Sequence, residues 1–593
     1  MQTLKKLLYF LSPQEQKHAG LLLLMILIMA LIDVLGIASI MPFMAVITNP
    51  SLIQTNYILN TMFQASSVIG VKTNQEFIFM FGFLVFIFLI FSISFKALTV
   101  YIQLRFIQMR EYSISKRLLE TYLHQPYSWF LNQNSANIGK SILSETGIFL
   151  GQSLGPMLTL LTQSTITIII FTLLLLIDLK LTVLIAFIFI GTYVLIYNLF
   201  RRYLSRKGKE RLIANEFRFK SISEAFGASK EVKLGGLEKI FINRYSKPAK
   251  IYAKNQASSQ IIGLLPRYFI EATTFGGMLL LTLYIISTTG DFVNSIPIIS
   301  VYAFAGYRLL PSIQQIYQSS TALKFSNSVI DKLYNDLKEL KINIGNENKD
   351  ILSFNKSITL NHIHYDYPNS SRTALKDINM IIPAKTTVGL IGTTGCGKTT
   401  TVDIILGLLS AQKGTLEVDD KVITKKNTRA WQQSIGYVPQ QIYLSDDTIA
   451  NNIAFGIDPK DISQQSIERA AKLANLHDFV INELQNQYQT VVGERGIRLS
   501  GGQRQRIGIA RALYHKPKVI ILDEATSALD IKTEEVVMSA INKLSKNITV
   551  ILIAHRLDTV KNCDIIFKLE KGQLIDQGKF NEIVDKTSIF ENN

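Results

Sequence analysis

A glycine-rich segment at residues 392–399 combines the residue types and the spacing that bind nucleotide phosphates. It reads GTTGCGKT, follows the apolar run 388–391 and precedes a helical pattern that begins near Thr400. Glycine lets successive backbone N–H groups turn toward an anion, and the N-terminus of the following helix adds a favourable potential. The segment therefore predicts a phosphate-binding loop between a strand and a helix. The residues expected to contact the phosphates are Gly392, Gly395, Gly397, Lys398, Thr399 and Thr400.

Two side chains of this loop have specific expected roles. Lys398 would reach the β- and γ-phosphates of a nucleotide, and the Thr399 hydroxyl would ligate Mg²⁺. Cys396 also lies in the loop, and we interpret it as a small residue that fills its position. The chain has 2 cysteines in all, without the spacing of a metal site or of a disulfide scaffold.

Two adjacent acids, Asp523 and Glu524, end a second apolar run that begins at Val519. A buried strand of this kind carries its terminal carboxylates to the sheet edge at which a phosphate loop lies. Asp523 would then hold Mg²⁺ directly or through water, and Glu524 would polarise the attacking water as a general base. The alternative is that the two acids only cap a helix, so the assignment depends on the neighbouring motifs.

The pentapeptide LSGGQ, residues 499–503, stands directly before a helical stretch and ahead of the acidic strand. With this pentapeptide the chain resembles the ATP-binding cassette (ABC) transporter family, and the resemblance covers essentially all 593 residues. It implies that ATP and Mg²⁺ are bound, with roles for four further residues. Tyr367 matches the aromatic residue that stacks on adenine, and Gln440 matches the glutamine that senses Mg²⁺ and water. Asp530 matches the loop that crosses to a partner cassette, and His555 matches the histidine that contacts the γ-phosphate.

The pentapeptide makes physical sense as a second anion cradle, because it places a serine and glycine backbone at a helix N-terminus. In the family this cradle closes on a nucleotide held by another subunit. One phosphate loop and one pentapeptide per chain imply that two chains pair head to tail; a homodimer is the simplest arrangement and a heterodimer with a similar half is the alternative. The residues of the cradle are Ser500, Gly501, Gly502 and Gln503.

The composition indicates that these motifs belong to a membrane protein. Apolar residues make up 48% of the chain and charged residues 18%, whereas soluble chains carry about 25% charged residues. A net charge of +17 would suggest a nucleic-acid partner, but most of this charge lies in the first part of the chain. Residues 1–340 carry 31 basic and 17 acidic residues, whereas residues 341–593 carry 31 basic and 28 acidic residues. Residues 201–260 alone hold 15 basic and 5 acidic residues. We therefore interpret the charge as a topology signal beside an anionic leaflet, and we expect no nucleic-acid partner.

Apolar stretches long enough to cross a bilayer recur six times before residue 325. The last is diluted by Arg308 and Pro311, so a buried helix of a soluble domain is its alternative reading. Lysine and arginine are concentrated before the first span and in the loops 105–150 and 201–260, which places both termini and the cassette in the cytoplasm. The expected spans are about 19–46, 77–104, 154–177, 181–200, 262–288 and 296–320.

The long loops continue the helical pattern of their flanking spans. We expect each to be two helices joined by a short crossing helix; a charged face without a partner is the alternative. Residues 51–65 could form an amphipathic helix on the outer surface or an ordered loop. The expected fold is an all-α polytopic membrane domain with six transmembrane helices and long cytoplasmic extensions, followed by an α/β P-loop nucleotide-binding domain. Its expected domains are 1–325, a linker at 326–352, and a cassette at 353–593.

Ionisable residues inside spans are costly and usually functional. Lys96, Arg267 and Arg308 come from three different spans, and together they would suit an anionic headgroup. The alternatives are that Lys96 extends toward the membrane interface and that Arg267 pairs with Glu271 one helical turn away. Asp33 is a further ionisable residue within a span.

The segments around the two arginines are similar to those of bacterial lipid-linked oligosaccharide flippases, a subgroup of the exporter-type half-transporters. The segment around Lys96 is also similar, except that lysine replaces the subgroup's arginine, which loses bidentate phosphate recognition. The resemblance implies ATP-driven flipping of a polyprenyl-diphosphate-linked oligosaccharide across the bacterial inner membrane. The alternatives are a multidrug or lipid-A-type exporter of amphipathic substrates, and a channel or regulator that uses the cassette only as a switch.

Overall fold

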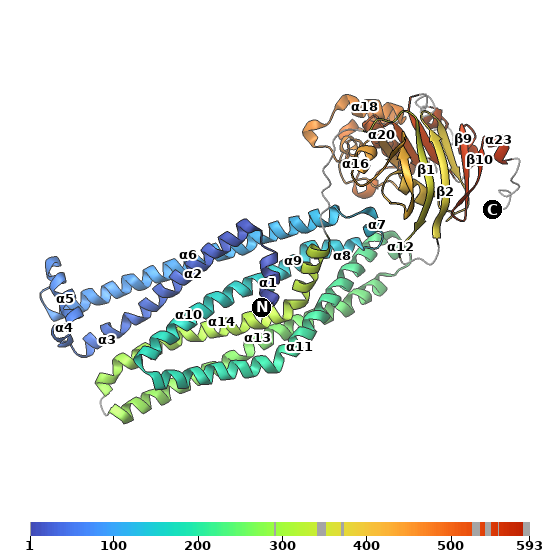
Figure 1. The fold of residues 1–593 in the computed structure, drawn as a ribbon. Coiled ribbons are helices and arrows are strands. Elements are labelled where there is room, and N and C mark those ends of the chain that lie inside the picture. Colours follow the sequence, from blue (N-terminus) through green and yellow to red (C-terminus); the bar gives the residue numbers. More distant parts are fainter. Residues whose placement is uncertain are drawn as a thin grey trace. The chain divides into compact units, whose positions relative to one another are not determined.

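The computed structural model describes residues 2–289, 292–340, 352–368, 373–524, 534–539, 547–554 and 557–584. They fall into two compact units, Met1–Gln125 with Asn132–Ile342 and Pro126–Leu131 with Asn343–Asn593. The first unit is helical and the second contains both helices and sheets (Figure 1). This confirms the expected fold class of a helical domain followed by an α/β nucleotide-binding domain.

The helical unit contains long helices joined by short ones. Its elements are α1 (Gln2–Tyr9), α2 (Pro13–Ala38), α3 (Ile40–Thr48), α4 (Leu52–Thr55), α5 (Tyr57–Ser66), α6 (Asn74–Leu123), α8 (Ser135–Gly139), α9 (Thr146–Phe149), α10 (Gly155–Ile177), α11 (Leu179–Gly227), α12 (Ser229–Leu234), α13 (Glu238–Thr289) and α14 (Phe292–Glu339). A 3₁₀ turn, Ser67–Ile69, and two π-helical segments, Lys140–Glu145 and Leu150–Leu154, complete it. Because α14 continues to Glu339, the first part of the expected linker is helical, and residues 341–351 lie outside the described residues.

Local sequence explains where the first long helices begin. Ser12 caps α2 and Thr73 caps α6, each in a reciprocal hydrogen-bonded pair with a glutamate three residues on. Among the described residues, three helical stretches are apolar and long enough to cross a membrane, Pro13–Thr48, Asn74–Leu123 and Ser135–Ile177. They contain the first three expected spans. The other three lie on α11, α13 and α14, where many side chains lie outside the described residues.

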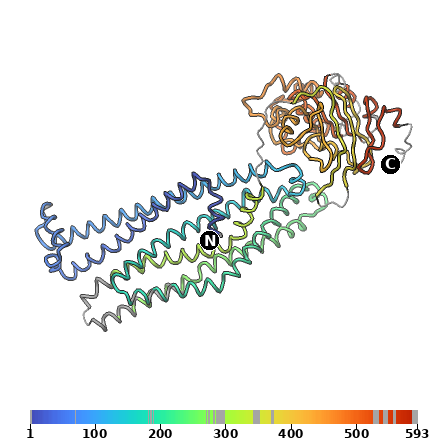
Figure 2. Tube along the Cα trace, viewed as in Figure 1, coloured from blue at the N-terminus to red at the C-terminus, as the bar shows by residue number. Residues whose placement is uncertain are grey.

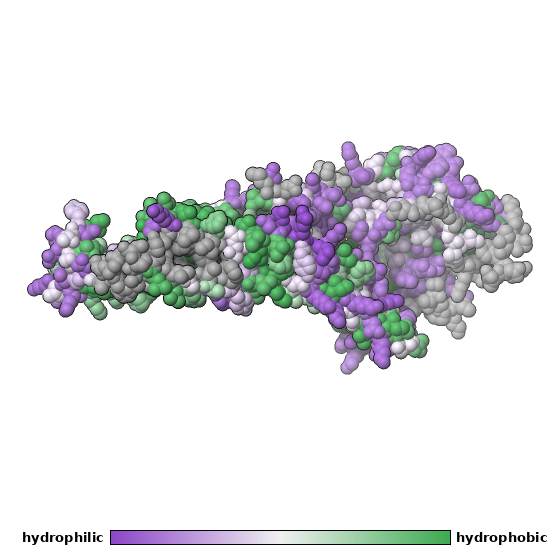
Figure 3. All heavy atoms as spheres, turned by 90° about the horizontal axis from the view of Figure 1, so that it is seen from below, coloured by the Kyte–Doolittle hydropathy of each residue, from purple (hydrophilic) through white to green (hydrophobic). Residues whose placement is uncertain are grey.

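Hydrophobic side chains form much of the visible surface of the helical unit, and the end that carries α4 and α5 is hydrophilic (Figure 3). Such exposure of apolar residues along long helices is typical of a surface that faces lipid or another subunit. At the hydrophilic end the segment forms two short helices, α4 and α5, so it is helical as one alternative expected, and its place on the outer surface stays a prediction. Ile53 and Leu59 pack on Val46 and Phe77, which ties this short segment to the ends of α3 and α6.

The regions 105–150 and 201–260 are helical extensions, as expected. α6 ends at Leu123 and is followed by the short helix α7 (Tyr127–Phe130), and α11 is followed by α12 and then α13. Helices α11 and α13 run side by side along this extension (Figure 2). This unit also contains a buried ion pair, in which Arg211 Nη2 lies 3.7 Å from Glu145 Oε2 and both side chains are fully buried.

The second unit contains two sheets. Strands β1 (Ser357–Asp366), β2 (Thr373–Pro383), β4 (Lys413–Val418) and β5 (Lys421–Val422) form an antiparallel sheet in the order β2-β1-β4-β5. The other sheet has the order β10-β9-β3-β8-β7-β6, with β3 (Thr387–Ile391), β6 (Ile435–Val438), β7 (Val519–Asp523), β8 (Thr549–Ile553), β9 (Ile565–Glu570) and β10 (Gln573–Gly578). All its pairings are parallel except β9 with β10.

Helices and apolar clusters surround these sheets. The helices are α7, α15 (Lys398–Ile405), α16 (Thr428–Gln432), α17 (Ile449–Ile453), α18 (Gln464–Leu473), α19 (His477–Glu483), α20 (Gly501–Tyr514), α22 (Leu557–Val560) and α23 (Phe580–Val584). Strands β3, β7 and β8 are buried along their whole length, which is why their sequences are continuous apolar runs rather than alternating ones. Because these three strands are parallel neighbours, their carboxyl ends share one sheet edge, where the phosphate-binding loop begins.

Candidate functional site

The phosphate-binding loop connects β3 to α15 in a backbone shape that requires glycine. Gly392 has φ +148°, and a Cβ there would lie 2.2 Å from the Leu569 carbonyl oxygen. Gly397 has φ +109°, and a Cβ there would lie 2.7 Å from Leu375 Cδ2. Both distances are far below van der Waals contact, so these two glycines let the loop pass between β9 and β2.

Lys398 lies inside this loop as the first residue of α15. Its ammonium donates to the Gly392 carbonyl oxygen at 2.7 Å and to the Thr393 carbonyl oxygen at 3.2 Å, and the residue is only 6% exposed. The lysine is thus positioned at the mouth of the loop by carbonyl acceptors that a phosphate would replace. Cys396 is buried beside it, with Sγ 4.0 Å from Lys398 Nζ, which fits the interpretation of a small residue filling its position.

The loop borders a cavity of about 590 Å³. It is lined by Tyr367, Thr373, Ala374, Thr394, Gly395, Gly397, Lys398, Thr399, Thr400, Gln440, Glu524, Ile553, Lys571 and Gly572. The Tyr367 hydroxyl lies 3.0 Å from Thr400 Oγ1, so the aromatic ring is held at the end of the cavity next to α15. The structure therefore brings together Tyr367, Gln440, Glu524 and the phosphate-binding loop, which are far apart in the sequence.

Glu524 and Gln440 contact one another at the opposite wall. Gln440 Nε2 donates to Glu524 Oε2 at 2.8 Å, and the Glu524 backbone N–H donates to the Ile553 carbonyl oxygen at 3.2 Å. Glu524 has φ +48°, an uncommon value for a residue with a side chain. This geometry fixes the carboxylate at the end of β7, facing the same cavity as Lys398.

Asp523 is 7% exposed at the end of β7 and accepts a hydrogen bond from the Tyr437 hydroxyl at 3.4 Å. Burial and the negative charge of Asp523 raise the pKa of Asp403 to about 6. Burial and both carboxylates raise the pKa of Tyr437, and burial with the charge of Asp403 raises the pKa of Tyr127. A cluster of acids and tyrosines therefore lies behind the site, with one tyrosine supplied by α7. The motifs contain no signal for Asp403, Tyr437 or Tyr127, because their proximity arises only when α15, β6, β7 and α7 pack.

The donor set suits Mg²⁺. Thr399 and Asp523 contribute a hydroxyl and a carboxylate, and Gln440 contributes an amide; oxygen donors with one or two carboxylates are what Mg²⁺ uses beside substrate phosphates. Among the described residues, no group of three or more His, Cys, Asp or Glu side chains could hold a metal. The residues at hand therefore fit a nucleotide-bound magnesium ion.

The LSGGQ pentapeptide lies at the N-terminus of α20. Ser500 Oγ accepts from the Gln503 backbone N–H at 3.2 Å, while Gln503 Oε1 accepts from the Ser500 backbone N–H at 2.8 Å. This capping box satisfies two backbone donors and leaves those of Gly501 and Gly502 available. None of these residues is among those that line the described cavity. Asp530 and His555 lie outside the described residues.

Several cavity residues could not be identified from motifs. Lys571 and Gly572 form the turn between β9 and β10, and Thr373 and Ala374 begin β2. The Gly572 backbone N–H donates to the Cys396 carbonyl oxygen at 3.0 Å, and the Gly572 carbonyl oxygen accepts from the Lys376 N–H at 2.7 Å. The turn therefore joins the phosphate-binding loop to β2, and its only sequence signal is a Lys-Gly pair between two short strands.

A second charged site lies in the helical unit. Arg308 Nη2 on α14 lies 2.8 Å from Asp33 Oδ1 on α2, and Lys96 Nζ on α6 lies 4.0 Å from Asp33 Oδ2. We name these three residues the Asp33 cluster. Arg267 is not part of it: its Nε lies 2.7 Å from Glu271 Oε1 on the same helix, α13, as the alternative interpretation of that pair expected. The structure thus brings two of the three expected substrate cations together, around a carboxylate.

The fold and the site define a class of membrane protein that couples a phosphate-loop nucleotide-binding domain to a bundle of long apolar helices. Comparison with known proteins identifies the family. The profile described as ABC transporter transmembrane region matches residues 19–306, and the profile described as ABC transporter matches residues 375–527. The chain belongs to the ABC transporter family.

Named relatives agree with this assignment. The ATP-dependent lipid A-core flippase of Wigglesworthia glossinidia brevipalpis is 44% identical over 233 residues, 39% of this chain and 40% of the relative. That of Saccharophagus degradans is 35% identical over 314 residues, and the chain matches 52% of its length. The curated relatives are therefore matched over about half of their length or less. A solved bacterial Atm1-family ABC exporter with ATP bound has a TM-score of 0.76 at 22% identity, covering 97% of both chains, which shows a common fold.

Proposed function

We propose that this protein is an ATP-driven exporter that flips a lipid-linked anionic substrate, a polyprenyl-diphosphate-linked oligosaccharide, out of the cytoplasmic leaflet. Two observations carry the proposal: the second unit has a cavity lined by the phosphate-binding loop, and the helical unit holds the two cations of the Asp33 cluster. Charged side chains are expensive at membrane depth and usually contact a substrate or an ion. The relatives named lipid A-core flippases support a lipid substrate.

At the cavity, each residue has a defined task. The Lys398 ammonium leaves its carbonyl acceptors to bind the β- and γ-phosphates, and the turned N–H groups of the loop bind the oxygens between them. Glu524 accepts a proton from the attacking water, and Gln440 orients that carboxylate through the 2.8 Å hydrogen bond. A magnesium ion held by Thr399 and Asp523 would neutralise the charge that develops on the phosphates.

The cavity is half of the proposed site, because the LSGGQ pentapeptide of the same chain does not line it. A second copy of the chain, placed head to tail, would supply Ser500 and the glycine N–H groups to the γ-phosphate. Asp530 and His555 are proposed to contact the partner cassette and the γ-phosphate. Two copies would thus form two composite nucleotide sites, closed by ATP and released by hydrolysis.

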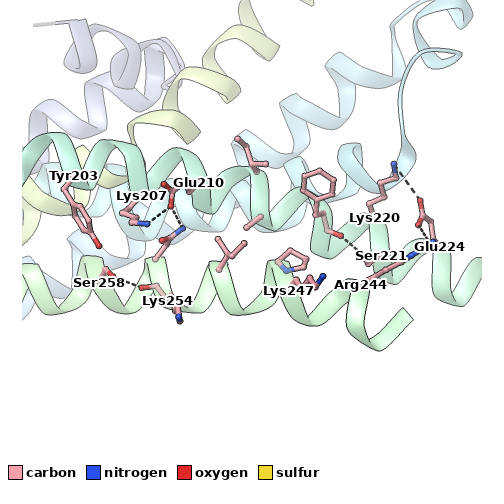
Figure 4. Close-up of a pocket in the computed structure, with 16 residues that line it drawn as sticks. Tyr203, Lys207, Glu210, Lys220, Ser221, Glu224, Arg244, Lys247, Lys254 and Ser258 are labelled. Carbon is pink, nitrogen blue, oxygen red and sulfur yellow. Dashed lines mark hydrogen bonds and ion pairs between the residues drawn. The ribbon is translucent and has the colours of Figure 1, made fainter. Parts of the chain in front are cut away.

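A groove between α11 and α13 supports the homodimer (Figure 4). Ile213, Phe217 and Ile251 line it and are each about half exposed, which is unfavourable for a surface in water. Two ion pairs labelled in Figure 4, Lys207 with Glu210 and Arg244 with Glu224, also lie along the groove. We propose that the second copy covers this groove. We also propose that the protein lies in the bacterial inner membrane, with both termini and the cassette on the cytoplasmic side.

Reconstituted protein tests the function. In proteoliposomes the wild type is expected to flip a fluorescent lipid-linked oligosaccharide only with ATP, and the substrate should stimulate ATP hydrolysis. Replacing Lys96 and Arg308 together by glutamine should abolish the stimulation while ATP binding persists. Flipping that is unchanged in this variant contradicts the proposed substrate contacts. Stimulation by amphipathic drugs but not by the lipid-linked oligosaccharide would instead favour the multidrug exporter.

A further inference from the structure

The Asp33 cluster consists of two cations that share one carboxylate. Asp33 is 2% exposed, whereas the side chains of Lys96 and Arg308 remain 31% and 23% exposed. The carboxylate is thus enclosed by the helices, and each cation keeps an open side. The Ser92 hydroxyl, from the same helix as Lys96, adds a 3.4 Å hydrogen bond to Asp33 Oδ1.

The residues around the cluster are apolar, which strengthens the electrostatic interactions of its charges. On α2, Ala30 and Val34 flank Asp33 and belong to a buried apolar core that also contains Ala305 and Leu309, the neighbours of Arg308 on α14. In an apolar environment a charge is screened weakly, so the cations attract any anion that reaches their open sides. The formal charges of the cluster sum to +1, because two cations face one carboxylate, and a second anion is therefore electrostatically favoured.

We propose that Lys96 and Arg308 form an anion-binding site whose resident anion in this conformation is the Asp33 carboxylate, and that the phosphate groups of a ligand compete with Asp33 for the two cations. The site is specific for a diphosphate or a similar doubly charged group, which can engage both cations at once. This inference rests on the proposed function and deepens it, because it identifies which cations hold the headgroup and what they hold before it arrives.

A purely structural ion pair predicts a different result on substitution. If Asp33 only stabilises the helix contact, Asp33→Asn lowers stability and leaves anion affinity unchanged or weaker. If Asp33 is the competitor, the same substitution frees both cations and tightens anion binding. The two accounts therefore differ in the direction of the affinity change.

The experiment measures binding of farnesyl diphosphate and of inorganic pyrophosphate to the full-length protein in nanodiscs, without nucleotide. Asp33→Asn is expected to bind farnesyl diphosphate about tenfold more tightly than the wild type, because an opposing charge is removed from a weakly screened site. Asp33→Glu, which keeps the charge, should bind like the wild type. Glu120→Gln is the matched control, since it removes a carboxylate from an exposed pair with Lys116 on α6.

The two probes identify the source of the anion. Tighter binding of both supports a site open to free phosphates, and tighter binding of farnesyl diphosphate alone supports a lipid headgroup. No tightening for either probe overturns the proposal. If Asp33→Asn does not fold, the variant Lys96→Gln, which keeps Asp33, replaces it in the experiment. Lys96→Gln is expected to bind both probes more weakly than the wild type, and unchanged binding overturns the proposal. If the affinity shift is seen while reconstituted protein flips no lipid-linked oligosaccharide, the proposed substrate is wrong and the anion site stands.

Discussion

The nucleotide cavity and the Asp33 cluster each contain an almost fully buried charged side chain, Lys398 and Asp33, but they are assembled differently. Most of the cavity comes from one continuous loop and from the ends of two neighbouring parallel strands. The cluster comes from α2, α6 and α14, which are far apart in the chain, with one charge each. The phosphate-binding loop of the cavity therefore depends on local backbone geometry, whereas the cluster depends on how three helices pack. Substitutions in the cavity should affect chemistry, and substitutions in the cluster should affect both stability and ligand affinity.

The largest expected effect is on the chemistry of the cavity. Glu524→Gln keeps the size of the side chain and removes the proposed proton acceptor, so ATP turnover should fall by about 10²–10⁴-fold while ATP binding persists. Turnover by purified protein in nanodiscs measures this. Glu483→Gln, at the exposed end of α19, is the control and should turn over ATP like the wild type. A Glu524→Gln variant that keeps half of the wild-type rate would contradict the assignment.

The next effect distinguishes two arginines of the helical unit. Arg308→Met leaves the buried Asp33 carboxylate with the 4.0 Å contact to Lys96 and the 3.4 Å hydrogen bond from Ser92, and it should destabilise the protein by about 3 kcal/mol. Arg267→Met removes an exposed pair within one helix and should leave stability unchanged. The apparent thermal midpoint of each variant in nanodiscs is the readout. An equal decrease in the thermal midpoint of both variants would show that leaving Asp33 without Arg308 is no more destabilising than breaking the exposed pair of Arg267.

A smaller, pH-dependent effect is expected behind the cavity. The folded protein raises the pKa of Asp403 from 3.8 to about 6, so its ionised form is disfavoured on folding and stability falls as the pH rises between these values. Asp403→Asn removes this loss. Its thermal midpoint, measured without nucleotide or Mg²⁺, should therefore exceed that of the wild type at pH 7.5 and approach it at pH 4. An increase in the thermal midpoint that is the same at both pH values would mean that the ionisation of Asp403 is not its cause.

The smallest effect separates helix capping from catalysis. Ser500→Ala and Ser463→Ala each remove a serine cap, of α20 and α18, and each should cost about 1 kcal/mol of stability. Only Ser500 is proposed to reach a nucleotide, so only Ser500→Ala should also slow ATP turnover. Thermal midpoints and turnover rates of the two variants are compared side by side. Equal turnover in both would argue against the composite site.

The sequence predicts the cavity better than the cluster for a physical reason. The loop at residues 392–399 and the acids Asp523 and Glu524 carry their own backbone context, so the motif itself predicts where they lie. The turn at Gly572 could not be predicted, because its contact with the loop requires β9 and β2 to be in place. The same holds for Asp403, whose raised pKa arises from tertiary packing against Asp523.

For the helical unit the sequence identifies the charged residues but not their partners. The i,i+4 spacing of Arg267 and Glu271 predicts their pairing as one alternative, because both lie on a single helix. No periodicity connects Asp33 with Arg308, since their contact depends on the packing of α2 beside α14. Asp33 could therefore be recognised as an ionisable residue in a span but not as the counter-ion of two expected substrate contacts.

The central claim is that ATP hydrolysis in the cavity drives movement of a diphosphate-linked lipid past the cations of the Asp33 cluster. The most direct test is ATP-dependent flipping of a lipid-linked oligosaccharide in proteoliposomes by the wild type, Glu524→Gln and the double variant Lys96→Gln with Arg308→Gln. We expect flipping by the wild type alone, with ATP binding retained in both variants. Flipping at the wild-type rate by the folded double variant would contradict the claim.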